Sequence, residues 1–193
     1  MADPVQTTKP DLYKVTRIIK DGAIVADDWQ FVPLASELAP EAHPIPAGRV
    51  IVPLPVWQSQ RHVLAARGDV GVWLAPADDP QQLADSFGQI ALIAVDFPKF
   101  TDGRGYSIAS LLRSKLHWKG ELRAIGDVLH DQLYYMQRVG FNAYALRSDR
   151  SAEVGLAALK DFEDIYQFST DQALPVARRH FGANTAATRG SAT

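Results

Sequence analysis

The residues best suited to chemistry lie in one short stretch, Asp96-Phe-Pro-Lys-Phe-Thr-Asp-Gly-Arg-Gly-Tyr-Ser107. It combines two carboxylates, two cations and a phenol with two glycines, which let a main chain approach another group closely. The apolar run Ile90–Val95 precedes it and a helical pattern follows it, so we predict a loop between a strand and a helix. Free N–H groups at a helix start, together with an arginine, can hold sulfate, phosphate or a carboxylate. The stretch therefore predicts an anion-binding or partner-docking site.

The binding candidates in this loop are Lys99, Asp102, Gly103, Arg104, Gly105 and Tyr106, and Asp96 is a candidate catalytic carboxylate. A second interpretation needs no ligand, because Asp102 and Gly103 can form a turn while Arg104 pairs with Asp96 or Asp102. Ser107 would then cap the following helix. The density of charged and aromatic groups favours a functional loop, and the sequence leaves both interpretations open.

Motifs for large cofactors are weak or missing. The pattern Gly103-x-Gly105-x-x-Ile108 resembles part of a dinucleotide fingerprint, but a branched residue replaces the third glycine, which close helix packing requires. No P-loop and no Gly-x-Ser-x-Gly elbow occurs. The chain has no cysteine, which excludes disulfides, thiolate-held metal clusters and a catalytic thiol. The sequence therefore leaves the cofactor unknown.

Asp127 follows the predicted strand Leu122–Ile125 and is the second candidate catalytic carboxylate. Asp127, His130 and Asp131 share one helical face, which could bind a divalent cation or pair an acid with a base. A structural interpretation is stronger, because Asp127 can cap a helix and Asp131 lies in the first turn, where the helix dipole favours a carboxylate. We therefore predict no metal site. The candidates for anion or partner binding on this segment are Asp131, Gln132 and Arg138.

An α/β architecture is expected to position these loops. The predicted strands are Val50–Val52, Val70–Leu74, Ile90–Val95, Leu122–Ile125 and Asn142–Leu146. Helical spacing of apolar residues separates them, and four glycines are each expected to end a helix: Gly68, Gly88, Gly120 and Gly140. Alternating strands and helices predict a mainly parallel sheet, either open and doubly wound or a partial barrel. An N-terminal β-hairpin with its turn at Lys20-Asp-Gly22 precedes it.

Composition restricts the class of protein further. The 193 residues, 47% of them hydrophobic, suit a single domain over 1–193, with flexible ends at 1–11 and 182–193. A net charge of -2 gives no general attraction to nucleic acid. The N-terminus lacks the pattern of a signal peptide, and no apolar run approaches the roughly 20 residues of a membrane span. We therefore expect a cytoplasmic protein with no membrane and no nucleic-acid partner.

Three motifs together resemble a known family. They are Val95–Ser107, Gly120-Glu-Leu-Arg-Ala-Ile-Gly-Asp-Val-Leu-His-Asp-Gln-Leu133 and Gln137-Arg-Val-Gly-Phe141. They resemble the bacterial family called domain of unknown function 934, whose members are often labelled oxidoreductases involved in sulfite reduction. The resemblance is close over Ile90–Leu146 and looser elsewhere. It implies a role in assimilatory sulfur metabolism, but it carries no catalytic residues over to this chain.

The resemblance leads to two hypotheses. Sulfite reduction moves six electrons through metal or flavin centres, and this chain has no thiolate to hold a cluster or ligate a haem. We therefore expect an accessory protein that docks on sulfite reductase through the loop and the neighbouring surface 134–138. The alternative is an enzyme acting on a small sulfur oxyanion or a sulfated nucleotide, with Lys99 and Arg104 holding the anion and Asp96 or Asp127 transferring protons. Whether the chain is an enzyme is left open.

Overall fold

The N-terminal hairpin forms where the turn residues predicted it. Strand β1 (Arg17–Lys20) pairs antiparallel with β2 (Ala23–Ala26). Asp21 and Gly22 between them have φ angles of 49° and 76°, the left-handed conformation that two-residue hairpin turns need. The structure, a computed structural model, describes residues 12–159. The ends expected to be flexible, 1–11 and 182–193, lie outside these residues.

The other strands form one eight-stranded sheet with the hairpin. They are β3 (Gln30–Phe31), β4 (Val50–Pro53), β5 (Val70–Leu74), β6 (Leu92–Phe97), β7 (Glu121–Gly126) and β8 (Ala143–Tyr144). The order is β2-β1-β8-β7-β6-β5-β4-β3, with β3 to β8 parallel and β1 antiparallel to β2 and β8. The parallel strands follow chain order without the reversal of a doubly wound sheet. The sheet is therefore a curled half-barrel, the second of the two predicted forms.

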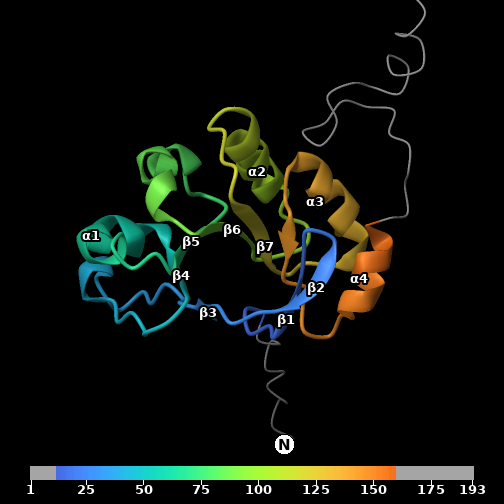
Figure 1. Cartoon of the computed structure of the whole chain (residues 1–193), viewed down its shortest axis with the longest axis horizontal. Coiled ribbons are helices and arrows are strands. Elements are labelled where there is room, and N and C mark those ends of the chain that lie inside the picture. The colour runs from blue at the N-terminus through green and yellow to red at the C-terminus, as the bar shows by residue number, and fades with distance from the viewer. Residues whose placement is uncertain (1–11, 160–193) are drawn as a thin grey trace, which may run out of the picture.

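The helices lie on the outer, convex side of the sheet (Figure 1). They are η1 (Pro40–Ala42), α1 (Leu54–Leu64), η2 (Pro80–Gln89), α2 (Arg104–Ser114), η3 (His130–Gln132), α3 (Leu133–Val139) and α4 (Ala152–Ala158), where η marks 3₁₀-helix. Sequential parallel strands joined by right-handed crossovers place all their connections on one side, which explains the arrangement.

The glycines expected to end helices do so only in part. Gly140 caps α3 in the left-handed conformation, with φ 111°, as predicted. The prediction was wrong for Gly88, which lies inside η2. It was also wrong for Gly68 and Gly120, because α1 already ends at Leu64 and α2 at Ser114. Gly120 is needed for another reason: a Cβ atom there would collide with the ring of Trp118.

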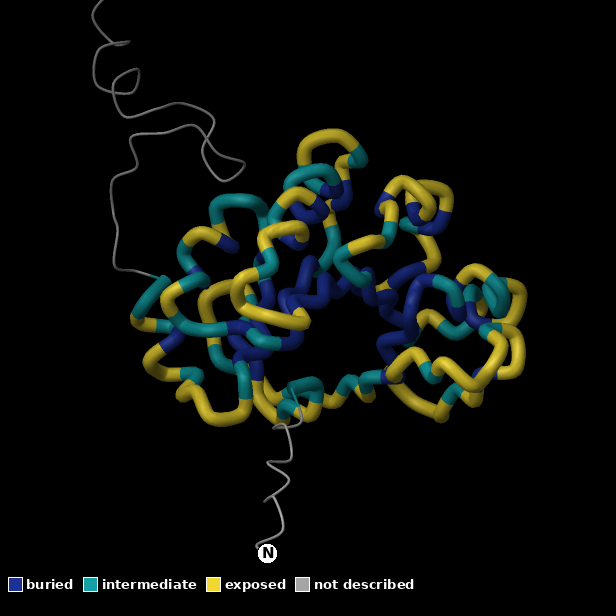
Figure 2. Tube along the Cα trace, turned by 180° about the vertical axis from the view of Figure 1, so that it is seen from behind, coloured by how far each residue is buried: buried dark blue, intermediate teal, exposed yellow. Residues whose placement is uncertain are grey.

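Two apolar layers cover the two faces of the sheet. The larger layer lies between the convex face and the helices and includes Trp57, Val95 and Phe97. The smaller layer covers the concave face and includes Trp73 and Ile125. All six residues of β6 are buried, which agrees with a parallel strand covered on both faces. The buried residues follow the arc of strands in Figure 2, whereas exposed residues lie mainly in the outer helices and loops.

The concave face also holds a buried ion cluster. Arg123 on β7 donates to both carboxylate oxygens of Asp27, at 3.0 and 2.9 Å, and to Glu121 at 2.8 Å. Lys20 of β1 pairs with Glu121 at 2.8 Å. The side chains of Arg123, Asp27 and Glu121 are 2%, 7% and 9% exposed. This cluster ties the hairpin and the chain after it to the middle of the sheet.

Candidate functional site

The predicted loop leaves the carboxyl end of β6, and side chains from the next loop hold its main chain at Phe100. The Phe100 N–H donates to Asp127 Oδ2 at 3.0 Å. The Phe100 carbonyl accepts from Gln132 Nε2 at 2.7 Å. Both polar groups of one residue are thus fixed, while the Phe100 side chain is 52% exposed. The loop presents an aromatic ring to solvent from an anchored backbone.

The start of α2 is occupied by a carboxylate of the chain itself. Asp102 Oδ1 accepts from the Arg104 main-chain N–H at 3.1 Å, and the Arg104 guanidinium pairs with both Asp102 oxygens. Arg104 holds the pKa of Asp102 below its usual range, and Asp102 raises the pKa of Arg104. Arg104 thus pairs with Asp102, as the second interpretation of the loop predicted. Ser107 does not cap α2 as that interpretation also predicted, because it lies inside the helix. Gly103 precedes the helix and is exposed.

Asp127 connects two loops through hydrogen bonds from both. Its Oδ2 accepts from Phe100, and its Oδ1 accepts from Arg147 Nη1 at 2.9 Å. The prediction that Asp127 caps a helix was wrong. The next helix, η3, starts later and has Leu129 at its N-cap. Within residues 12–159, Asp127, His130 and Asp131 belong to no group of three potential metal ligands.

An aromatic row runs from the loop onto α3. Tyr106 contacts Phe97 edge-on, with 5.3 Å between ring centroids, and contacts Tyr135 in the same way at 5.3 Å. Gly105 makes the first contact possible, because a Cβ atom there would lie 2.5 Å from the Phe97 ring. Burial raises the pKa of Tyr106, helped by Asp131 and Tyr135 nearby. Tyr135 is 55% exposed, so the row ends in solvent.

Asp96 faces the opposite, concave side of the sheet. It is 7% exposed, and its Oδ1 accepts from the Tyr13 hydroxyl at 3.1 Å. Burial raises the pKa of Asp96 to about 6; the Tyr13 hydrogen bond acts against the rise and nearby Asp102 adds to it. Burial and the Asp96 carboxylate raise the pKa of Tyr13, so its phenol stays protonated and donates. Gly126 has φ 93° and leaves room for this carboxylate.

Replacing Asp96 with Asn should remove a pH dependence of stability. The folded-state pKa of about 6 lies above the ordinary value of 3.8, so the folded protein binds this proton more tightly than the unfolded chain. Stability contributed by this group therefore rises as pH falls from about 7 to about 4.5, by about 2 kcal/mol. The unfolding free energy of both proteins should be measured with urea at these two pH values. The gain in unfolding free energy at the lower pH should be about 2 kcal/mol smaller in Asp96→Asn than in the wild type. An equal increment in both proteins would contradict the assignment.

The candidate residues lie in three places: the loop after β6 with its neighbours, the concave face of the sheet, and a cleft beside α3. Contacts link the loop to Asp127 and Gln132, and Tyr106 lies near Asp131. Asp96 lies on the concave face, and neither Lys99 nor Arg104 hydrogen-bonds to it within residues 12–159. Arg138 lies farther along α3 and lines a separate cleft.

Three contributors were missed by sequence reasoning. Phe100 was overlooked beside its charged neighbours, although an aromatic residue in a polar loop is itself a signal. Arg147 follows the last predicted strand, and nothing in its local sequence connects it to Asp127. Tyr13 lies 83 residues from its partner Asp96, and no local pattern connects the two.

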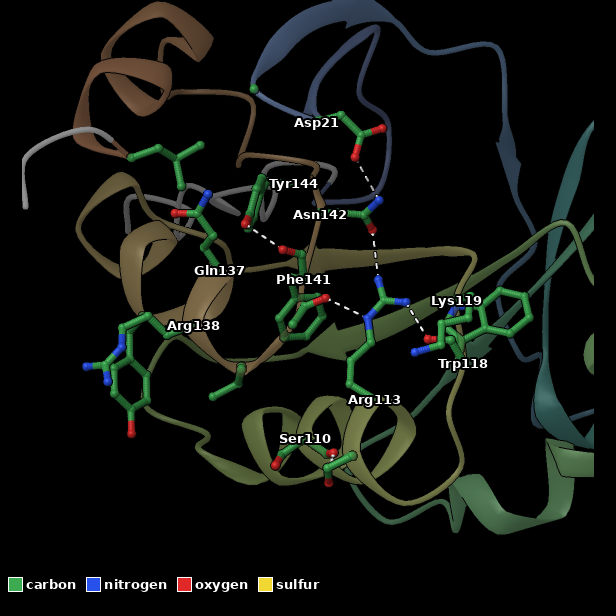
Figure 3. Close-up of a pocket in the computed structure, with 16 residues that line it drawn as sticks. Asp21, Ser110, Arg113, Trp118, Lys119, Gln137, Arg138, Phe141, Asn142 and Tyr144 are labelled. Carbon is green, nitrogen blue, oxygen red and sulfur yellow. Dashed lines mark hydrogen bonds between the residues drawn. The ribbon is translucent and has the colours of Figure 1, made fainter. Parts of the chain in front are cut away.

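A cavity lies away from the loop, between α2, α3 and the β1–β2 turn. It has a volume of about 920 Å³ and is bounded by the last turns of α2 and α3, the β1–β2 turn and Leu159. Arg113 spans its floor, donating to the carbonyls of Gly140, Trp118 and Gly120 and to Asn142 Oδ1 (Figure 3). Through these hydrogen bonds, the Arg113 guanidinium joins the loops at the amino ends of β7 and β8. The cleft is therefore a second surface, distinct from the carboxyl edge.

The fold and the site define a mixed α/β protein with a half-barrel sheet and an anchored aromatic loop at its carboxyl edge. A family profile described as a bacterial protein of unknown function (DUF934) matches residues 71–177, more than half of the chain. The chain belongs to this family, which confirms the predicted resemblance. Comparison with curated proteins and with solved structures gave no match. Within residues 12–159, no helix is long and apolar enough to cross a membrane.

Proposed function

We propose that this protein is a cytoplasmic accessory factor of assimilatory sulfate and sulfite reduction that docks on sulfite reductase through the loop after β6. The observation that carries the docking part is Phe100, which is half exposed while Asp127 and Gln132 fix its main chain. The sulfur part rests on the role implied by the family resemblance. The proposal needs no redox group in this chain.

Rigid presentation is what makes Phe100 a good docking residue. A side chain held in its binding position loses little conformational entropy on association, and buried aromatic residues supply much of the energy of protein interfaces. The hydrogen bonds to Phe100 come from the β7–α3 connection, so the loop is braced from outside itself. Tyr135, at the end of the aromatic row, extends the same kind of surface along α3.

The charges beside Phe100 indicate what the partner surface contains. Lys99 is exposed and forms no salt bridge within residues 12–159, whereas the charge of Arg104 is offset by Asp102. A matching surface has an apolar pocket for the Phe100 ring and an acidic rim facing Lys99. Asp131 lies on the adjoining segment, where it contributes a further polar contact at the edge of the interface.

Replacing Phe100 with Ala should weaken binding to purified sulfite reductase by at least about 30-fold, because a central aromatic anchor is worth roughly 2 kcal/mol or more. The matched control is Val63→Ala, which shortens an apolar side chain that is 56% exposed on α1, far along the chain from the loop. It should bind as the wild type does. Titration by calorimetry gives both affinities. The proposal fails if the wild-type protein does not bind, or if Phe100→Ala binds equally well.

A second candidate is the enzyme acting on a small sulfur oxyanion or a sulfated nucleotide. It is favoured by Asp96, a buried carboxyl at the carboxyl end of a central strand, whose pKa of about 6 suits proton transfer near neutral pH. Titration with sulfite, sulfate and adenylyl sulfate separates it from the docking function. Heat with one of these ligands, abolished in Asp96→Asn, supports the enzyme. No heat and no thermal shift at about millimolar ligand exclude it.

A further inference from the structure

Tyr13 fills a slot on the concave face of the sheet. Its ring lies flat against Phe31, with 4.2 Å between centroids and 7° between planes. Phe31 in turn contacts Trp73 on β5 at 5.4 Å. At the end of the slot the Tyr13 hydroxyl donates to Asp96. One planar ring is thus held by a stacking surface on its face and by a buried carboxylate at its edge.

This pair of contacts is a general way to bind a planar ring that carries hydrogen-bond donors. Stacking on an aromatic surface holds the plane, and a carboxylate in a desolvated site accepts strong hydrogen bonds from ring N–H or amino groups. The slot also lies at the carboxyl ends of the strands, inside the curve of the sheet, where barrels of this kind place ligands. An ionised carboxylate there disfavours anions and favours neutral or cationic rings.

The segment that carries Tyr13 lies against the sheet without belonging to it. Strand pairing at this end of the chain starts at Arg17. One further main-chain hydrogen bond, from the Asp27 N–H to the Thr16 carbonyl at 2.9 Å, holds the last residue of the segment 12–16. Beneath it, a space of only about 10 Å³ remains between Tyr13, Ile125 and Ala145, so the segment packs closely against this part of the concave face. Displacing it would expose a concave surface while leaving every strand pair of the sheet in place.

We propose that Tyr13 occupies a binding slot for a planar heteroaromatic ligand with amino or ring N–H donors, and that residues 12–16 are its lid. The ligand stacks on Phe31 and donates to Asp96 in place of the tyrosine hydroxyl. The proposal does not depend on docking through Phe100, which lies in the loop beyond the strand end and has its own test.

The test uses 2-aminopyridine, a small planar ring with an amino donor, and 2-methylpyridine, which has nearly the same shape without the donor. Tyr13→Ala should bind 2-aminopyridine at least about tenfold more tightly than the wild type, and about tenfold more tightly than it binds 2-methylpyridine. The double variant Tyr13→Ala/Asp96→Asn should lose this preference. Calorimetry measures the affinities. If the folded Tyr13→Ala protein binds neither compound, or both equally, the slot does not exist.

A second readout follows the lid in the full-length wild-type chain. Lys14 is exposed within the lid, so ligand that displaces the lid should speed tryptic cleavage after Lys14 by at least about threefold. Tyr13→Phe keeps the ring but loses the bond to Asp96, and it should be cleaved faster than the wild type even without ligand. This variant also serves if Tyr13→Ala does not fold. Unchanged cleavage on adding 2-aminopyridine to both proteins would refute the lid.

Discussion

Replacing Arg123 with Ala should cost about 3–5 kcal/mol of unfolding free energy, since Asp27 and Glu121 would be left almost fully buried with their main cationic partner removed. Lys20 would remain near Glu121, but Asp27 would keep no cationic partner within residues 12–159. Burial already raises the pKa of Asp27 in the presence of Arg123. The loss should be measured by urea unfolding at about pH 7, where both carboxylates are ionised in the unfolded chain.

The pH dependence of this loss distinguishes an unpaired charge from lost packing. Without Arg123 the folded-state pKa of Asp27 rises further above its ordinary value, so the variant regains stability as pH falls and the carboxyl takes up a proton. The matched control is Arg49→Ala, which breaks an Arg–Asp pair whose side chains are 57% and 68% exposed. It should cost at most about 1 kcal/mol. A similar small cost for Arg123→Ala would show that the buried cluster contributes little.

Replacing Gly126 with Ala should cost about 4 kcal/mol, from two sources. The backbone there has φ 93°, which a residue with a side chain adopts only at a cost of about 1–3 kcal/mol. The added Cβ atom would also lie 2.5 Å from the Phe97 carbonyl oxygen and 2.6 Å from Asp96 Oδ1. Relieving this overlap moves the ends of β6 and β7 apart and adds a cost of similar size.

Gly22→Ala separates these two sources. Gly22 has φ 76°, but a Cβ atom added there would meet nothing within 4 Å, so only the backbone cost of about 1–2 kcal/mol is expected. Chemical denaturation of both variants gives the difference, which is the steric part at Gly126. If the two substitutions cost the same, the close approach of Asp96 to Gly126 is not important for stability.

Much of the fold could be predicted because its signals are local. Buried strands such as Ile90–Val95 are continuous apolar runs, and the turn at Asp21 and Gly22 has residues that tolerate positive φ. The choice between an open sheet and a partial barrel could not be made, since it depends on strand order, which spacing does not encode. The segment 80–89 forms 3₁₀-helix rather than a helix ended by Gly88, in a stretch where Asp85, Ser86 and Gly88 are weak helix formers.

The sequence predicted which segment forms the candidate site, but not how its side chains are arranged. The mixture of glycines, charges and aromatic residues marked the loop after β6, and its neighbours Asp127 and Gln132 were marked as well. What their side chains do depends on the approach of two consecutive loops, which the parallel pairing of β6 and β7 creates. Tyr13 and Asp96 are 83 residues apart in the sequence, and they meet because residues 12–16 lie across the concave face of the sheet. Only the three-dimensional structure reveals this contact.

Among residues 12–159, the outermost strands β2 and β3 of the half-barrel are each unpaired along one side, and this bears on how the chain behaves at high concentration. Exposed strand edges can pair with other chains and start aggregation. Here β3 has two residues and β2 has four, so each edge offers few N–H and C=O groups to a neighbouring molecule. The sheet thus stays open as a half-barrel, but its short edge strands give other chains little to pair with.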